Sequence, residues 1–272
     1  MLDSRKREIR IEADAFREKC KVSRYGIIDL FKECERLGYK LIRYPLGENA
    51  DLGFTVRRDK DIIIFTNSCS RLSREIFTLA HEIGHIILHI EKEKSFIDDK
   101  LTITGKSTNE KEQEANYFAA CLLMPTEEVH RFVDLEIQES GKCGLTAMDI
   151  ARMMSEFNVS FDMALNRLEA LGLIDGSQKL CLDSEKVQRR VGKLLQCVGG
   201  NAKLNVPSEE IRIPYEYIDY VIYNYNHNAI PKETLEKALA CYQLNIEDIS
   251  DQLIEYSETD DDLDDLIGGL DD

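Results

Sequence analysis

The sequence predicts an α+β fold in which a small sheet packs on a long apolar helix, followed by a helix-turn-helix-like unit and a mainly helical C-terminal region. Short β-branched or aromatic segments between residues 39 and 66 alternate with Pro, Gly and Asn, as is typical of strands and turns. Residues 77–90 form an apolar run with the length of a helix, and later segments are mostly amphipathic at the helical period. With 272 residues and 43% hydrophobic content, the chain can bury a substantial core.

The expected elements are bounded by recognisable start and stop residues. Helices are expected at residues 4–20, 26–37, 77–90, 109–125, 145–174 with a break at Asn158, 184–198, 214–225, 232–242 and 246–256, and strands at residues 39–44, 53–57 and 61–66. An Asn cap and a Pro stop bound the helix at 109–125. The polar segment 91–108 before it is expected to be a solvated connector, with a mobile lid as the alternative.

His81, Glu82 and His85 have the spacing of a helical zinc-protease site. At 3.6 residues per turn, positions i and i+4 lie on one helix face about 6 Å apart, so both imidazoles can reach one metal ion. A carboxylate beside the metal can take a proton from water and pass it to a leaving amine. Two histidines and a glutamate are costly to bury in an apolar helix unless something binds them. The alternative is a pair of satisfied core histidines with Glu82 facing solvent.

A tetrahedral metal site needs a third protein ligand, which a second helix can supply. His89 continues the same helical stripe, and one straight helix rarely wraps three ligands around one ion, so His89 is expected either to support the ligands from behind or to be structural. Glu112 lies on the face of the 109–125 helix that Ala115 and Ala119 leave uncrowded. These small residues let the two helices approach closely and present Glu112 to the metal.

Two segments together resemble one known family. Phe-Thr-Leu-Ala-His-Glu-Ile-Gly-His at residues 77–85, followed by the Glu-x-Glu-Ala-Asn to Leu-Leu-Met-Pro segment at residues 112–125, closely resembles the ImmA/IrrE family of bacterial and phage metallo-endopeptidases. The likeness covers roughly residues 5–175. It implies a zincin-like catalytic domain that binds Zn²⁺ and cleaves peptide bonds.

The resemblance also implies a role for each site residue. In that family the two motif histidines and a glutamate of the second helix bind zinc, and the motif glutamate is the general base. These roles correspond here to His81, His85, Glu112 and Glu82. Glu114 is the competing third ligand on another face of its helix, and the alignment through residues 116–125 favours Glu112.

A substrate follows from the same resemblance. Members of this family commonly cleave or inactivate a helix-turn-helix transcriptional repressor encoded beside them, which relieves repression of a mobile element or of stress genes. We therefore expect a zinc-dependent endopeptidase whose protein substrate is such a repressor. The alternative is a non-catalytic regulatory protein that binds and inhibits a repressor stoichiometrically, and a zinc hydrolase of a small amide is a third possibility.

The expected domains are a zinc metallopeptidase domain at residues 1–142, a helix-turn-helix-like module at 143–176, a mainly helical region of unknown role at 177–256 and an acidic tail at 257–272. Acidic residues outnumber basic ones in the module, so direct DNA binding is not expected and a packing or partner-binding role is favoured. Five tyrosines between residues 215 and 225 are expected to bury their ring faces in an amphipathic helix, with a binding platform as the alternative.

The net charge of −16 argues against nucleic acid and anionic membranes as primary partners and permits attraction to a basic protein. The acidic tail either mimics phosphate toward such a partner or is a disordered solubilising end. The eight cysteines contain no Cys-x-x-Cys pair, and most are expected to be reduced and buried. Neither a membrane span nor a signal-peptide stretch is recognisable, so a cytoplasmic location is expected.

Overall fold

The computed structural model describes residues 1–47, 49–58, 61–89, 95–98, 110–138 and 144–254, and the fold is α+β as predicted. The chain forms two compact units, Met1–Pro214 and Tyr215–Asp272. Within the described ranges, no helix combines the length and the apolar character that crossing a membrane requires.

The sheet contains four strands, in the order β1 (Lys40–Tyr44), β3 (Asp61–Asn67), β2 (Gly53–Arg58) and β4 (Ser95–Asp98). β1 and β3 pair in parallel, whereas β2 pairs antiparallel with β3 and with β4. The three predicted strands are confirmed. β4 corrects the expectation of a plain connector at 91–108, because four residues are too few for a periodic signal and pairing with β2 defines the strand. The remaining parts of that segment, and with them the alternative of a mobile lid, lie outside the described residues.

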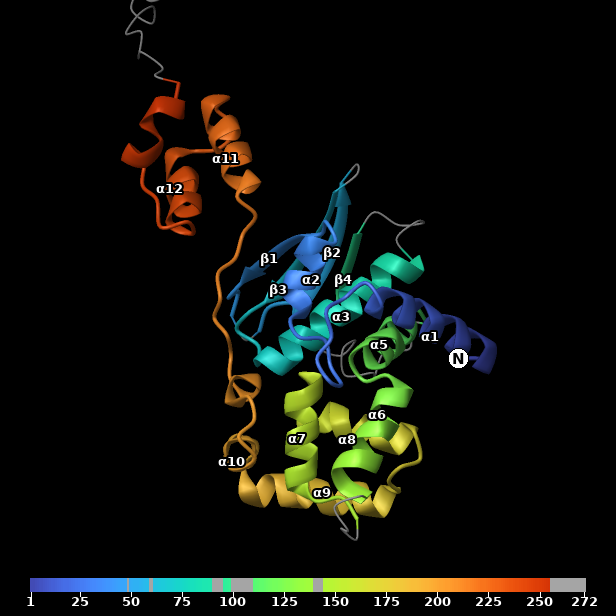
Figure 1. The fold of residues 1–272 in the computed structure, drawn as a ribbon. Helices are drawn as coiled ribbons and strands as arrows, with labels where there is room; N and C mark the ends of the chain where they lie inside the picture. The colour runs from blue at the N-terminus through green and yellow to red at the C-terminus, as the bar shows by residue number, and fades with distance from the viewer. Residues whose placement is uncertain (48, 59–60, 90–94, 99–109, 139–143, 255–272) are drawn as a thin grey trace, which may run out of the picture. The chain divides into compact units, whose positions relative to one another are not determined.

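Four helices flank the strands in the chain, and the last two of them carry the two sequence motifs. They are α1 (Asp3–Arg17), α2 (Leu30–Arg36), α3 (Leu72–His89) and α5 (Glu110–Leu123). α3 packs against β2 and β3, and α5 packs against both α3 and α1 (Figure 1). α3 begins before the apolar run because its first turns bury the polar residues Ser73 and Glu75, which the hydrophobic pattern does not reveal. α2 begins at Leu30 rather than at residue 26 because Asp29 caps it, accepting a hydrogen bond from Lys32 N at 3.1 Å.

The predicted helix-turn-helix-like unit is present as α7 (Ala147–Phe157) and α8 (Phe161–Ala170). It follows α6 (Thr126–Val133) and a π-helical turn at Asp134–Gln138, neither of which the sequence analysis predicted. Asn158 ends α7 in the left-handed region with a φ of 56°, and Ser160 Oγ caps α8 by accepting a hydrogen bond from Met163 N at 3.1 Å.

Two helices replace the single helix predicted at 184–198. They are α9 (Gly176–Arg189) and α10 (Val191–Cys197). Asp175 forms a capping box with Gln178 that begins α9 early, and Arg190, with a φ of 60°, separates the two helices. α9 lies along α8, where its lysines Lys179 and Lys186 pair with acidic side chains of α8 at 2.5 and 2.6 Å.

Residues 206–212, here called the return segment, bring the chain back to the sheet and α3. Leu72 N donates a hydrogen bond to Val206 O at 2.9 Å. The backbone of Arg212 forms an isolated antiparallel β-bridge with the backbone of Arg43 of β1. One cluster of buried apolar side chains extends from α1 through α3, α5, α7 and α8 to α10. Because α7–α10 share this core, residues 144–214 belong to the same compact unit as the sheet and its helices, and the finer division predicted at residues 142 and 176 stays a prediction.

The second unit is small and has its own core. α11 (Glu216–Asn226), α12 (Lys232–Ala240) and a 3₁₀ turn at Glu247–Gln252 agree with the positions of the last three predicted helices. Its buried apolar side chains are Val221, Ile222, Leu235, Leu239 and Ile249. The acidic tail lies outside the described residues.

The cysteines differ from the expectation that most are buried. Of the seven that the described ranges include, only Cys34 and Cys121 are buried, and Cys181 and Cys197 are exposed. All seven are free thiols. Cys181 lies on α9, before the helix that the sequence predicted at 184–198, and Cys197 lies at the end of α10.

Candidate metal centre

The structure brings together three side chains singled out in the sequence, His81 and His85 on α3 and Glu112 on α5. The Nε2 atoms of the two histidines are 3.1 Å apart. Glu112 Oε2 lies 3.3 Å from His81 Nε2 and 3.2 Å from His85 Nε2. These are the only three side chains in the described ranges that form such a His, Cys, Asp or Glu group.

The separations of these three atoms fit one tetrahedral ion. Ligand atoms bound at about 2.0–2.1 Å with tetrahedral angles are about 3.3 Å from one another. The three observed separations of 3.1–3.3 Å agree with that value. Both imidazoles are fully buried and the Glu112 side chain is 12% exposed, so burying the carboxylate there is favourable only with a positive partner. The donor set therefore suits a divalent cation.

Close packing of α3 on α5 positions the third ligand. A Cβ added at Gly84 would lie 3.1 Å from Ala115 Cα and 3.2 Å from Phe118 Cδ1. Ala115 and Ala119 are fully buried in this contact, in agreement with the predicted small-residue face. The absence of side-chain bulk lets the helix backbones approach, and Glu112 consequently reaches across to the histidines.

Glu82 points toward β2 rather than toward solvent. Its Oε2 accepts a hydrogen bond from Thr55 Oγ1 at 2.6 Å, and both residues are fully buried. Gly53, two residues earlier on β2, makes this approach possible, because a Cβ there would lie 2.4 Å from Thr78 Cγ2. Sequence analysis missed Thr55, since a threonine in a strand carries no signal of a partner 27 residues away.

Glu114, the competing ligand, is engaged elsewhere. Arg5 of α1 donates two hydrogen bonds to its carboxylate, at 2.8 and 2.7 Å. The pairing with Arg5 lowers the pKa of Glu114, which therefore stays ionised. His89 Nε2 lies 3.7 Å from Glu114 and 3.2 Å from Lys111 O, so it joins this network and not the three-residue cluster. Burial lowers the pKa of His89.

A buried ion pair fixes the first turns of α3 against the sheet. Arg43 of β1 donates two hydrogen bonds to Glu75, both at 2.8 Å, and the two side chains are 4% and 0% exposed. Thr66 and Ser208 donate to the same carboxylate at 3.0 Å. Burial by itself lowers the pKa of Arg43, whereas its hydrogen bonds to Glu75 raise that pKa. The net result is a raised pKa for Arg43. Arg43 also lies 3.7 Å above the ring centre of Phe31.

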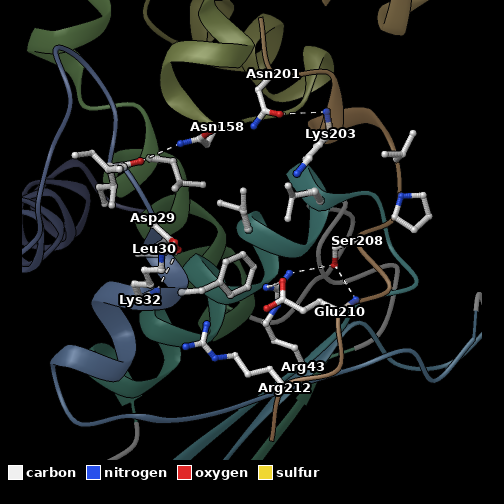
Figure 2. A pocket seen from close by; sticks show the side chains of 18 residues that line it. Asp29, Leu30, Lys32, Arg43, Asn158, Asn201, Lys203, Ser208, Glu210 and Arg212 are labelled. Carbon is white, nitrogen blue, oxygen red and sulfur yellow. Dashed lines mark hydrogen bonds and ion pairs between the residues drawn. The ribbon is translucent and has the colours of Figure 1, made fainter. Parts of the chain in front are cut away.

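A separate cavity of about 640 Å³ lies between α2, the first turns of α3 and residues 201–212. Figure 2 shows the side chains that line it. None of the predicted site residues lines it. Its charged side chains are largely paired within the protein, as Arg43 with Glu210, Arg212 with Glu35 and Lys32 with Asp29. The cavity and the three-residue cluster are therefore distinct features of the first unit.

Comparison with known proteins agrees with the motif. Residues 34–169 match a peptidase family model described as the IrrE N-terminal-like domain, and this match covers half of the chain. No curated protein matches the chain. The matched range includes the whole sheet and both ligand helices, whereas α1, the return segment and the second unit lie outside it.

Proposed function

Because the chain belongs to the IrrE N-terminal-like family of metallopeptidases, we propose that it is a zinc-dependent endopeptidase. The family implies a metal, and the observation that supports zinc is the cluster of His81, His85 and Glu112 with mutual separations of 3.1–3.3 Å. Two imidazoles and one carboxylate are a donor set typical of catalytic zinc, which leaves a fourth position for water or substrate.

Glu82 is the proposed general base. A zinc ion held by the three ligands would act as a Lewis acid and lower the pKa of a water molecule toward neutrality. Glu82 would take a proton from that water and pass it to the leaving amine. Thr55 fixes one carboxylate oxygen of Glu82 at 2.6 Å, which restricts the orientation of the base.

The proposed substrate is a helix-turn-helix transcriptional repressor, and the proposed compartment is the cytoplasm, where such repressors act. Support comes from the resemblance of the paired motifs and from the net charge of −16, which attracts a basic DNA-binding protein and repels DNA. The first unit also disfavours direct DNA reading by α8. The basic residue Arg167 of α8 is buried, and the exposed acidic residues Asp162 and Glu169 of the same helix pair with lysines of α9.

Metal content tests the site directly. Purified wild type should contain about one zinc per chain by inductively coupled plasma mass spectrometry, and His85→Ala and Glu112→Ala should lose it while remaining folded. Glu114→Ala is the matched control, because Glu114 pairs with Arg5, and it should keep the metal. Loss of zinc in Glu114→Ala with retention in Glu112→Ala would refute the ligand assignment.

Turnover separates the enzyme from a stoichiometric inhibitor. Glu82→Gln should retain zinc and fold, and it should cleave a purified repressor from the neighbouring gene about 10²- to 10⁴-fold more slowly. Wild type should produce fragments at a substoichiometric ratio to the repressor. If Glu82→Gln relieves repression as well as wild type, and only at a one-to-one ratio, the protein acts by binding and the peptidase proposal is rejected.

A further inference from the structure

The negative charge of the chain is concentrated in its second unit. Residues 215–272 contain sixteen acidic and two basic side chains and carry −14 of the net charge of −16. The first unit, by contrast, is close to neutral at −2. The part of the second unit that the structure describes, residues 215–254, carries −5. Long-range attraction of a charged partner therefore originates mainly in a segment outside the metal centre.

Aromatic side chains are exposed on the same unit, contrary to the expected burial. Tyr215, Tyr217, Tyr220 and Tyr223 are 74%, 43%, 56% and 60% exposed. The core-facing side of α11 is occupied by Val221 and Ile222 instead, so these tyrosines fall on its other faces. Tyrosine is among the residue types that are enriched at protein interfaces, and these tyrosines contribute nothing to the core.

One stripe of α11 combines both properties. Its members are spaced three or four residues apart and face away from the core: Glu216, Asp219, Tyr220, Tyr223 and His227. The Tyr223 ring stacks on His227 with ring centres 3.9 Å apart, and His227 Nδ1 lies 2.7 Å from Tyr223 O, which fixes both rings. This stripe, here called the acidic tyrosine stripe, thus presents rigid ring faces beside carboxylates.

We propose that the acidic tyrosine stripe is a docking site for a protein partner with a lysine- and arginine-rich surface. Tyrosine faces attract ammonium and guanidinium groups and pack on their methylene stems. The neighbouring carboxylates pair with the same cations, and the acidic residues that follow raise the association rate. DNA and anionic lipid are excluded by the sign of the charge. This inference deepens the proposed function and rests on it, because it makes the basic face of the substrate the element recognised outside the metal centre.

Peptide binding to the full chain tests the proposal without any cleavage step. The probe is a fluorescein-labelled 20-residue amphipathic helix with Lys and Arg on one face and Leu on the other, measured by fluorescence anisotropy. Wild type should bind it and should bind about tenfold more weakly when NaCl rises from 50 to 300 mM. A peptide of the same pattern with Glu in place of the cations should not bind.

The variant Tyr220→Ser/Tyr223→Ser should bind the basic peptide about tenfold more weakly or worse. Its matched control is Leu180→Ser/Val187→Ser, which removes two exposed apolar side chains, 71% and 72% exposed, from α9 of the other unit and should bind as wild type. A second variant, Glu216→Lys/Asp219→Lys, keeps the tyrosines and should also lose binding. Circular dichroism of each variant should match wild type, because none of the substituted side chains belongs to a core.

The docking proposal is rejected if both α11 variants bind the basic peptide with wild-type affinity, or if the affinity of wild type does not change with NaCl concentration. Unchanged affinity in both variants would leave only diffuse attraction by the acidic tail. Hydrolysis of a short neutral peptide is followed in parallel. Weak peptide binding with normal hydrolysis in Tyr220→Ser/Tyr223→Ser supports a docking role separate from the metal centre. If wild type binds the basic peptide and hydrolyses nothing, the docking site stands and the peptidase proposal fails.

Discussion

The contact between α3 and α5 at Gly84 makes a sharp prediction about the metal centre. A Cβ at this position would lie 3.1 Å from Ala115 Cα, 3.2 Å from Ala115 O and 3.2 Å from Phe118 Cδ1. Carbon atoms in favourable contact are about 3.5–4.0 Å apart. In Gly84→Ala the two helices must therefore separate locally by about half an ångström, since two of the three obstacles belong to backbone.

The expected loss falls on metal affinity more than on stability. Overpacking costs about 1–3 kcal/mol, but alanine is about 1 kcal/mol more favourable than glycine inside a helix. The net destabilisation is thus about 0–2 kcal/mol. Moving Glu112 by about half an ångström from separations of 3.2 and 3.3 Å spoils ligand geometry that tolerates little displacement, and zinc should bind about tenfold more weakly or worse.

Chelator competition measures the zinc affinity and urea unfolding of the apoprotein measures stability. Gly192→Ala in α10 is the matched control, because a Cβ there meets only Asn205 Nδ2 at 3.7 Å. It should gain about 0.4–1 kcal/mol and leave zinc binding unchanged. If Gly84→Ala also gains stability and binds zinc as wild type does, close helix packing does not set the ligand geometry and the reasoning is refuted.

Two further predictions concern stability. Glu75→Ala leaves the buried Arg43 guanidinium with only the half-exposed Glu210 as a carboxylate partner and should lower the free energy of unfolding in urea by about 3 kcal/mol; a loss below about 1 kcal/mol would contradict the buried pair. Glu33 has a pKa lowered from 4.5 by its hydrogen bond with Arg36, so its contribution is present above that value and lost as pH falls through the folded pKa. Glu33→Gln should therefore be less stable than wild type at pH 7, and the difference should shrink as pH falls through the folded pKa; a difference in the free energy of unfolding that does not change with pH would refute this.

Local periodicity carries most of what the sequence predicts correctly. The i and i+4 spacing places His81 and His85 on one face, and the small residues of the second helix indicate where it can approach. Capping residues such as Ser160 likewise define helix ends from their own side chains. Each of these signals depends on residues within one or two helical turns, so each can be recognised without the fold.

Contacts between distant segments carry no comparable signal. Arg5 and Glu114 are separated by 109 positions in the chain, and Thr55 and Glu82 by 27, so their pairing depends on how α1 and β2 pack. β4 is defined by its partner strand and not by its own four residues. The tyrosines of α11 illustrate the same limit, because amphipathic spacing shows that a helix has two faces without showing which face the small core of the second unit can cover.

The ligand helices are braced by segments outside the range matched to the family. Arg5 of α1 donates two hydrogen bonds to Glu114 and thereby ties α1 to α5. Ser208 of the return segment donates to Glu75 at the beginning of α3, beside Arg43. A chain cut to residues 34–169 would keep all three proposed ligands and lose both braces. Since one of these contacts joins α1 to α5 and the other anchors the beginning of α3, residues outside the matched range hold both helices that carry the proposed ligands.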